Sequence, residues 1–328
     1  MYGKSAFGLC IASPSMSYAS SEKETNGKYI VLNDGHFEVE AYTIEMRKTL
    51  IVFYSSQYTD EGGEERDSMG VVNRITDLWS QLESKYSQNG LVDYLAIGTD
   101  SDFTKLENEM NKLRNISLEN MREDRDELTA FVINVYNVLI RVAFVIAGIP
   151  KSDLSRLSFF DTVAVNVGGD IYTFNDMENG ILRANSVPPY HLAKPFPKGD
   201  RRESLALSSV DPRIHFALNC GAKSCPPVKQ YTAKGLNDEL QVSAIEFCQN
   251  KSNVSIDEER GELRLSKIFK WYMNDFASSR GVLPKQVSKY LIGMDQDSLD
   301  RLLRKGNVKT EFLNYDWTTN DTNSKRFG

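Results

Sequence analysis

The sequence predicts an α+β fold in which helices surround a small antiparallel sheet. Several segments have helical spacing or a long apolar run, at residues 71–86, 102–113, 128–149 and 232–250. Between them, short alternating runs flank turn residues and predict two hairpins, at residues 162–174 and 254–265. The 328 residues contain no internal repeat, so a repeat architecture is not expected.

The composition is that of a globular protein, with 41% hydrophobic and 26% charged residues. A chain of 328 residues can bury one large core or two modest ones without disulfide bonds. The net charge of −6 argues against a broad surface for nucleic acid or anionic lipid. We therefore expect a peptide or small-molecule substrate, or a protein partner, and neither nucleic acid nor membrane as a partner.

Three regions are expected along the chain. Residues 1–27 predict a disordered tail rather than a signal peptide, and a cytoplasmic location, because their apolar part is broken by Gly8 and followed by Pro14. Residues 28–67 predict a small β meander and an acidic linker, with strands at 29–32, 37–44 and 50–54. Residues 68–328 form the predicted main domain.

Residues 128–149 are long and apolar enough to span a bilayer. Asn134, Asn137 and Arg141 nevertheless fall on one narrow face of the expected helix, and such groups are costly in hydrocarbon. We therefore predict a buried helix whose polar stripe is hydrogen-bonded to a neighbouring backbone or a carboxylate. The alternative role for Asn134 or Asn137 is to face a thiol site and orient its substrate or loop.

A short helix is expected after the hairpin at 162–174. Asn175 would cap it and Glu178, three residues later, would complete a capping box. Arg183 is expected to pair with Glu178, to form another salt bridge or to hold an acidic substrate. The proline-rich loop at residues 186–204 is either a plain excursion or a lid whose Tyr190, His191 and Phe196 contact substrate.

His215, Cys220 and Cys225 locate the chemistry, because they bring one of three histidines close to two of four cysteines. Residues 214–218 alternate as a strand, which would turn His215 away from the core. The imidazole of His215 and the thiol of Cys220 would then lie at one edge of a sheet. The alternatives are structural packing, a Cys220–Cys225 disulfide, and a zinc site that lacks an obvious fourth ligand. The functional interpretation is a thiol activated by His215.

The last third is expected to be mainly architectural. A helix capped by Thr232 would bury Cys248, the hairpin at 254–265 follows, and an aromatic helix at 268–276 would pack into a core. A helix at 298–305 would end at Gly306. Asp316 would fix a loop near the site or cap a turn.

Five segments closely resemble the domain-of-unknown-function family numbered 547. They are INVYNVLI, IYTFNDMENGILR, DPRIHFALNCGAKSCPP, KIFKWYMNDF and FLNYDWTTN, which lie between residues 133 and 320. The resemblance as a whole extends from about residue 68 to about residue 320. The resemblance implies that these segments belong to one domain and converge in space. It also favours Glu178 as a functional residue, and it is compatible with a papain-like fold of rearranged order.

Two main classes of function follow. In a cysteine-dependent hydrolase or acyl transferase, Cys220 would attack a carbonyl, His215 would take the thiol proton and Glu178 would orient His215. The backbone of Gly221 and Ala222 would hold the oxyanion, and Cys225 would be the alternative nucleophile or second thiol. The alternatives are a non-catalytic interaction or regulatory domain and a thiol redox protein. Nucleotide-binding and metalloenzyme motifs are absent from the sequence, so no cofactor or metal is expected.

Overall fold

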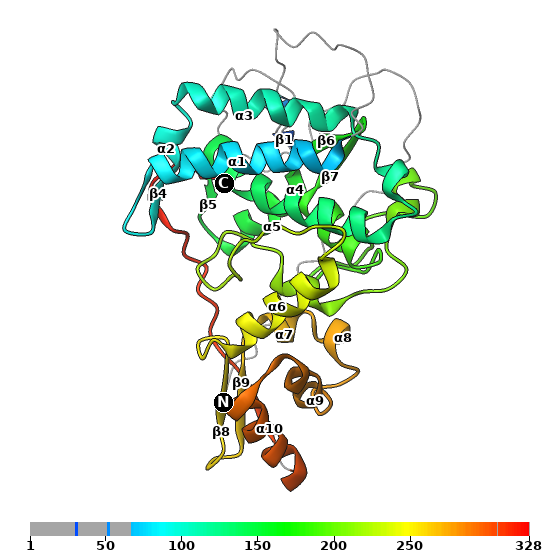
Figure 1. Ribbon diagram of the computed structural model, residues 1–328, viewed down its shortest axis with the longest axis vertical. Coiled ribbons are helices and arrows are strands. Elements are labelled where there is room, and N and C mark those ends of the chain that lie inside the picture. Colours follow the sequence, from blue (N-terminus) through cyan, green and yellow to red (C-terminus); the bar gives the residue numbers. More distant parts are fainter. Residues whose placement is uncertain (1–29, 32–50, 53–66, 307, 328) are drawn as a thin grey trace, which may run out of the picture.

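The structure is a computed structural model, and it describes residues 30–31, 51–52, 67–306 and 308–327. It has the predicted mixed α+β architecture, with small sheets among many helices. One end of the molecule contains α1 to α5, and the other contains α6 to α10 with β8 and β9 (Figure 1). The papain-like alternative is not shown by this arrangement.

The central element is helix α4, Arg125–Ile146, which confirms the predicted apolar helix with a start three residues earlier. It begins at Asp124, whose side chain accepts a hydrogen bond from the Glu127 backbone N–H. Of its most apolar stretch, 94% is buried inside the protein, so the helix is a core element. Burial of each large aliphatic side chain contributes roughly 1.5–3 kcal/mol, so this helix supplies much of the driving force for folding.

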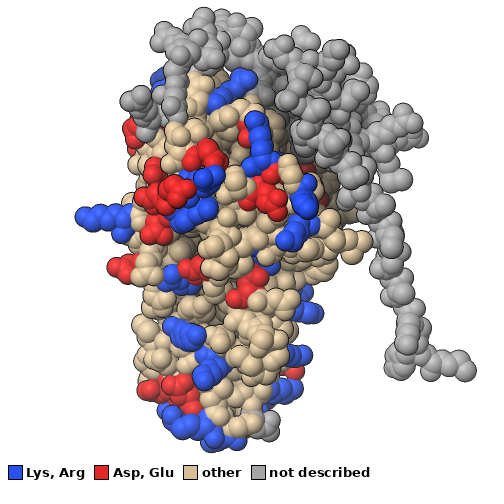
Figure 2. Space-filling model, turned by 90° about the vertical axis from the view of Figure 1, so that its right-hand side faces the viewer, with Lys and Arg blue, Asp and Glu red and all other residues tan. Residues whose placement is uncertain are grey.

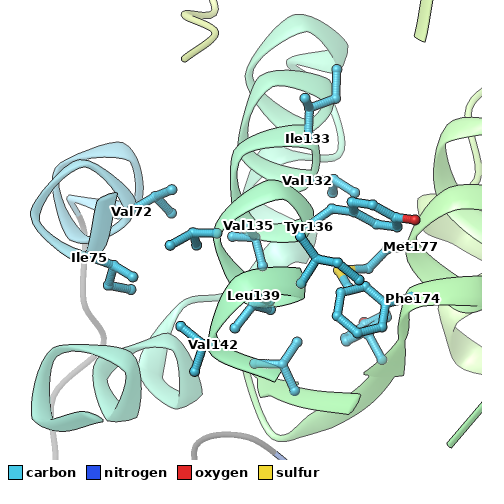
Figure 3. Packing of buried hydrophobic residues seen from close by; sticks show 14 of the residues in the cluster. Val72, Ile75, Val132, Ile133, Val135, Tyr136, Leu139, Val142, Phe174 and Met177 are labelled. Atoms are coloured by element: carbon cyan, nitrogen blue, oxygen red, sulfur yellow. The ribbon is translucent and has the colours of Figure 1, made fainter. Parts of the chain in front are cut away.

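The two predicted helices before α4 are present as α1, Ser68–Lys85, and α3, Ser101–Asn111; α1 packs against α4, and α3 packs against α1. Val72 and Ile75 of α1 point toward α4, whereas Tyr136 on another face of α4 points toward Phe174 and Met177 (Figure 3). The short elements around these helices are η1 Lys112–Asn115, η2 Leu118–Met121, α2 Tyr94–Ile97, β3 Ser87–Gln88 and β4 Leu91–Asp93.

The main sheet has the order β2-β1-β6-β7 and is mixed rather than antiparallel. Strands β6, Val163–Val167, and β7, Asp170–Thr173, form the predicted antiparallel hairpin, and its turn uses Gly168 and Gly169 at φ values of 61° and 86°. Strands β1, Ile30–Val31, and β2, Ile51–Val52, are parallel to each other, and β1 is parallel to β6. The other residues of the predicted meander and the predicted tail lie outside the described residues.

Helix α5, Asp153–Thr162, packs beside this sheet and was not predicted. Ser152 and Ser155 form a reciprocal capping box at its start. Its Phe159 is fully buried between the rings of Phe144 and Phe174. This packing fixes the orientation of α5, so that Arg156 and Phe160 line a cavity.

Two local predictions near the site were wrong. Residues 214–218 are not a strand: Pro212–Phe216 form the short helix η5, because Asp211 accepts from the Arg213 N–H and Pro212 occupies the first helical turn. Asp176–Leu182 form a π-helix, η3, in which Asn175 makes no capping bond and Glu178 is therefore not part of a capping box. A π-helical turn changes which side chains face a neighbouring cavity, and such turns are frequent at functional sites.

The second half is assembled from short elements. Helix α6, Leu236–Gln249, begins four residues after Thr232, whose hydroxyl instead accepts from the Gly235 N–H. The predicted aromatic helix is broken at Tyr272. The remaining elements are η4 Arg201–Leu205, β8 Val254–Asp257, β9 Glu262–Leu265, α7 Ile268–Trp271, α8 Met273–Phe276, α9 Leu283–Val287, η6 Ser288–Tyr290 and α10 Gly293–Lys305.

The C-terminal segment returns from the second half to the first. Strand β10, Lys309–Phe312, lies parallel to β9, after which the chain runs back along the molecule (Figure 1). There β11, Asp321–Asn323, pairs with β4, and β12, Arg326–Phe327, pairs with β5, Ile149–Pro150. The buried residues form one apolar cluster in each half, and residues 214–216 pass from one cluster to the other.

Candidate active site

A cavity of about 520 Å³ lies between the two halves. Its walls come from segments far apart in the sequence and include four of the predicted site residues, Cys220, Cys225, His215 and Glu178. Aromatic side chains form much of the remaining wall: Tyr136, Phe160, Trp271, Tyr272, Tyr315 and Trp317. The structure thus brings the predicted thiols, imidazole and carboxylate to one cavity.

The loop that carries the thiols is fixed by two asparagines. Asn137 of α4 donates to the Ala217 carbonyl at 2.8 Å and accepts from the Asn219 N–H at 2.9 Å. Asn219 accepts from the Gly221 N–H at 2.7 Å and donates to the Pro226 carbonyl at 2.7 Å. Each bond satisfies a polar group inside the protein, so the loop has one well-defined course.

Gly221 is required where the loop passes α4. Its φ is 80°, and an added Cβ would lie 2.3 Å from the ring of Phe144. A side chain at this position would therefore combine an unfavourable backbone conformation with a clash in the core. Because the Gly221 N–H is already bound to Asn219, it is not the free oxyanion donor expected from the sequence.

The other two polar residues of the α4 stripe have structural partners. Asn134 exchanges two hydrogen bonds with the backbone of Tyr231, at 2.7 and 2.9 Å. Arg141 is half-buried and pairs with Glu83 of α1 at 3.1 Å. These three residues therefore face the backbone of residues 217–231 and helix α1, and they do not line the cavity described above.

The two thiols share one hydroxyl. The oxygen of Tyr315 lies 3.1 Å from Cys225 Sγ and 3.5 Å from Cys220 Sγ, and the Cys220 N–H lies 3.2 Å from Cys225 Sγ. The Cys225 thiol, together with the Tyr315 hydroxyl, lowers the pKa of Cys220 to about 7 despite burial. Burial and the neighbouring Cys220 raise the pKa of Cys225 well above its ordinary value. Cys220 is thus the thiol that ionises near neutral pH, and both cysteines are free.

His215 is buried rather than directed out of a sheet. Its Nε2 lies 2.7 Å from Oδ2 of Asp275, and its ring stacks on Tyr272 with a centroid separation of 3.9 Å. Burial lowers the pKa of His215, and the bond to Asp275 offsets only part of that effect. Since Asp275 is ionised, Nε2 is the protonated nitrogen of the neutral ring, and Nδ1 remains as the basic nitrogen.

Asp275 was not predicted from the sequence. Arg183 binds it through two hydrogen bonds, from Nε at 2.6 Å and from Nη2 at 2.9 Å. Burial alone would raise the pKa of Asp275, but the hydrogen bonds from His215 and Arg183 hold it at about 2. The salt bridge of Arg183 is therefore with Asp275, which agrees with the expectation of an intramolecular salt bridge, and the alternative partner Glu178 does not bind it.

Glu178 does not contact His215. Its Oε1 accepts from the Tyr272 hydroxyl at 2.5 Å, and its Oε2 accepts from the Tyr136 hydroxyl at 3.4 Å. Tyr272 in turn stacks on His215. The predicted orientation of His215 by Glu178 is thus corrected to an indirect one, through Tyr272, while Asp275 makes the direct contact.

The segment around Asp316 is held against the thiol loop. Its backbone accepts from the Ser224 N–H at 3.2 Å, while the backbone of Thr318 accepts from the Lys223 N–H at 2.8 Å. The Asp316 carboxylate caps the following turn by accepting from the N–H and hydroxyl of Thr318. Both roles expected for Asp316 therefore occur together, and they place Tyr315 on the thiols.

The proline-rich loop contributes to one edge of the cavity. Tyr190, which has a φ of 68° and is 77% exposed, and His191 both line the cavity. Phe196 is instead buried against Gly180, where an added Cβ would lie 2.5 Å from its ring. Phe196 is therefore a packing residue, and the expectation that it contacts substrate was wrong.

Within the described parts of the chain, no group of three His, Cys, Asp or Glu side chains is placed to hold a metal ion. No hydrogen bond joins Cys220 to His215 among the described residues. The arrangement combines a thiol of lowered pKa, a neutral imidazole oriented by an ionised carboxylate, and a partly open, mainly apolar cavity.

Comparison with known proteins gives one match. Residues 118–248 match the family described as "Protein of unknown function, DUF547". This range includes Glu178, Arg183, His215 and both cavity cysteines, whereas Asp275 and Tyr315 lie beyond it. No curated protein and no solved structure matches the chain. The chain therefore contains a domain of the DUF547 family, at residues 118–248.

Proposed function

We propose that the protein is a cysteine-dependent hydrolase or acyl transferase in which Cys220 is the nucleophile and His215 is the general base. The observation that carries the proposal is the buried chain from Arg183 through Asp275 to His215, which ends in the cavity that contains Cys220. Such a chain fixes the tautomer of the imidazole and stabilises the imidazolium that forms during reaction. A purely structural histidine requires neither a fixed tautomer nor a stabilised imidazolium.

The first half of the reaction forms an acyl-enzyme. Nδ1 of His215 takes the proton from Sγ of Cys220, and the thiolate attacks the carbonyl carbon of the substrate. The C=O π electrons move to oxygen, giving a tetrahedral intermediate. When the intermediate collapses, the leaving group takes the proton from Nδ1 and departs, and a thioester remains on Cys220.

The second half releases the acyl group. In a hydrolase, Nδ1 takes a proton from water as the water oxygen attacks the thioester, and the proton then returns to Sγ as the carboxylic acid leaves. In a transferase, an amine or alcohol replaces the water. The Cys220 N–H is able to donate to the oxyanion, because its present partner is only the weak acceptor Cys225 Sγ.

The roles resemble those in papain-like proteases, where a thiol, an imidazole and a third polar group act together. Here the chain order is His215, Cys220 and Asp275, which differs from the Cys-His-Asn set of papain-like proteases and from the order Glu178, His215, Cys220 expected from the sequence. The absence of a Cys220–His215 hydrogen bond between these described residues is compatible with the proposal. Catalytic hydrogen bonds are often long in free enzymes and shorten in the substrate complex.

An acyl-transfer assay tests this function. Wild-type protein and the Cys220→Ser and Cys225→Ser variants are incubated with p-nitrophenyl acetate, and release of p-nitrophenol is followed together with the intact mass. We expect acetylation of Cys220 followed by repeated turnover, which persists in Cys225→Ser and is lost in Cys220→Ser. Failure of Cys220 to become acetylated, or turnover in Cys220→Ser, would overturn the proposal and favour a non-catalytic or a redox role.

A further inference from the structure

Arg156 on α5 differs from Arg183 and Arg202, two other arginines whose side chains are largely covered. Arg183 is bound by both oxygens of Asp275, and Arg202 contacts Asp176 at 3.2 Å and Asp200 at 2.8 Å. Arg156 is only 8% exposed, yet no acidic side chain of the described residues forms a salt bridge with it. A buried cation normally requires such a partner.

The hydrogen bonds of Arg156 are also incomplete. Nη2 donates to the Trp317 carbonyl at 3.3 Å, whereas Nε and Nη1 are buried and have no partner within the described part of the chain. An unpaired buried donor costs about 1–3 kcal/mol, and more when it is charged. We therefore expect the unpaired donors of Arg156 to gain a hydrogen-bond partner when a ligand binds.

Arg156 lies at the cavity that contains Cys220. Its positive charge contributes to the lowered pKa of Cys220, so it acts within the electrostatic range of the thiol. Three carboxylates line this cavity, and none forms a salt bridge with Arg156: Glu178 binds two tyrosines, Asp161 binds Asn175 and faces His191, and Asp153 is exposed at the start of α5. The guanidinium thus remains available to an anion that enters the cavity.

We propose that Arg156 binds a carboxylate of the substrate, and that the cavity therefore selects acyl substrates that carry a negative charge close to the reacting carbonyl. This inference rests on the proposed role of Cys220 and names the substrate class for that site. The planar fork of a guanidinium matches the two oxygens of a carboxylate and provides charge-assisted hydrogen bonds. A free peptide C-terminus and an acidic side chain both supply this chemistry.

The indole ring of Trp317 lies against this group. The ring lies 4.5 Å from the guanidinium carbon of Arg156 and stacks on Trp271. Trp317 belongs to residues 313–320, which form neither helix nor strand. Because Nε and Nη1 have almost no exposed surface, binding of a carboxylate moves Trp317 and changes its fluorescence.

Two alkylating agents of similar size test the proposal. Iodoacetate carries the charge that Arg156 would bind, and iodoacetamide does not. The ratio of their rate constants at Cys220, measured by mass spectrometry, is expected to be about tenfold or more above the ratio in urea-unfolded protein. Arg156→Gln should return the ratio to the unfolded value, whereas Arg156→Lys should retain part of the preference.

Lys267 provides a matched control, since it is another cation of the cavity wall. Lys267→Gln should leave the ratio within about twofold of wild type. An unchanged ratio in Arg156→Gln, or an equal loss in Lys267→Gln, would overturn the assignment to Arg156. The melting temperature of Arg156→Gln should equal or exceed that of wild type, because no carboxylate loses a partner. A marked decrease would assign Arg156 to structure instead.

Two small acids distinguish the sources of the carboxylate. N-acetylalanine has only an α-carboxylate, and the α-amide of N-acetylglutamate has only a side-chain carboxylate. Whichever acid slows alkylation of wild-type Cys220 by iodoacetamide and quenches or enhances Trp317 fluorescence identifies the source. Protection by neither acid would overturn the carboxylate assignment. Slow, pH-independent reaction with iodoacetamide alone would instead contradict the proposed function of Cys220.

Discussion

Two carboxylates lie close to His215, and their hydrogen bonds give them different tasks. Asp275 binds the ring nitrogen directly and is itself bound by Arg183. Glu178 binds the hydroxyl of Tyr272, whose ring stacks on His215. Only Asp275 is placed to stabilise a positive charge on the imidazole through a hydrogen bond.

Matched substitutions of these carboxylates separate the two tasks. Asp275→Asn should slow alkylation of Cys220 by iodoacetamide at pH 7 by roughly 10- to 100-fold, because an amide does not stabilise the imidazolium as a carboxylate does. Glu178→Gln should slow it by less than about threefold, because its carbonyl can still accept from Tyr272. A larger effect for Glu178→Gln would restore Glu178 as the direct partner of His215.

The protonation of His215 gives stability a defined pH dependence. Burial holds the folded-state pKa of His215 below the unfolded value of about 6.5, so the unfolded chain binds the additional proton first as pH falls. Stability from this group is therefore present above about pH 6.5 and is lost below it. Urea unfolding between pH 7.5 and 5 should show this loss in wild type and a smaller loss in His215→Gln. The reverse difference would mean that the folded imidazole is charged.

At the scale of elements, helix α4 supports the thiol loop from outside the cavity. Asn137 and Asn134 lie one turn apart and make similar pairs of bonds, but only Asn137 binds residues next to the thiol motif. The two residues therefore provide a comparison in which the chemistry of the substitution is the same and the position differs.

Asn137→Ala and Asn134→Ala should each destabilise the protein by about 1–3 kcal/mol, because each leaves a buried backbone N–H and carbonyl without their partner. Only Asn137→Ala should also change the rate at which Cys220 is alkylated, since it frees the loop at Ala217 and Asn219. Denaturant unfolding and thiol labelling measure the two effects. Equal changes in labelling for both variants would show that α4 does not position the loop specifically.

The elements also show which parts of the fold could be predicted. The apolar spacing of α1 and α4 extends over many turns, so both helices were identified correctly. Residues 214–218 are too few for alternation to distinguish a strand from a short helix. The decisive signal was Asp211 followed by Pro212, which starts η5.

At the scale of the whole molecule, the site is assembled from residues that are distant in the sequence. His215 and Cys220 could be predicted because histidine and cysteine are rare in this chain. Asp275 could not, because nothing local distinguishes it from the other acidic residues; the available signal was its place in KIFKWYMNDF, one of the family-like segments. Trp317 and Tyr315 reach the cavity because the chain returns along the molecule after β10 (Figure 1).

The returning segment makes the chemistry of the thiols depend on the whole fold. Tyr315→Phe removes the hydroxyl shared by both sulfurs and should raise the pKa of Cys220 above about 7, without changing the core. Iodoacetamide labelling against pH measures the shift, and Tyr231→Phe, whose hydroxyl binds Ser243 away from the thiols, is the control. An unchanged pKa in Tyr315→Phe would exclude a role for this hydroxyl.

The surface is compatible with access by small or acidic substrates rather than long polyanions. Both signs of charge lie side by side on the face shown in Figure 2, and the chain has a net charge of −6. Selection of an acidic group would therefore depend on Arg156 inside the cavity and not on a broad positive surface.

The pH dependence of cysteine alkylation tests directly whether Cys220 is the reactive thiol. Wild-type protein is labelled with iodoacetamide from pH 5 to 10, and Cys220, Cys225 and Cys248 are quantified separately by mass spectrometry. We expect Cys220 to react with a midpoint near pH 7, while Cys225 and the buried Cys248 react slowly throughout the neutral range. A midpoint for Cys220 at or above the ordinary thiol value of about 8.5, or faster labelling of Cys225, would contradict this expectation.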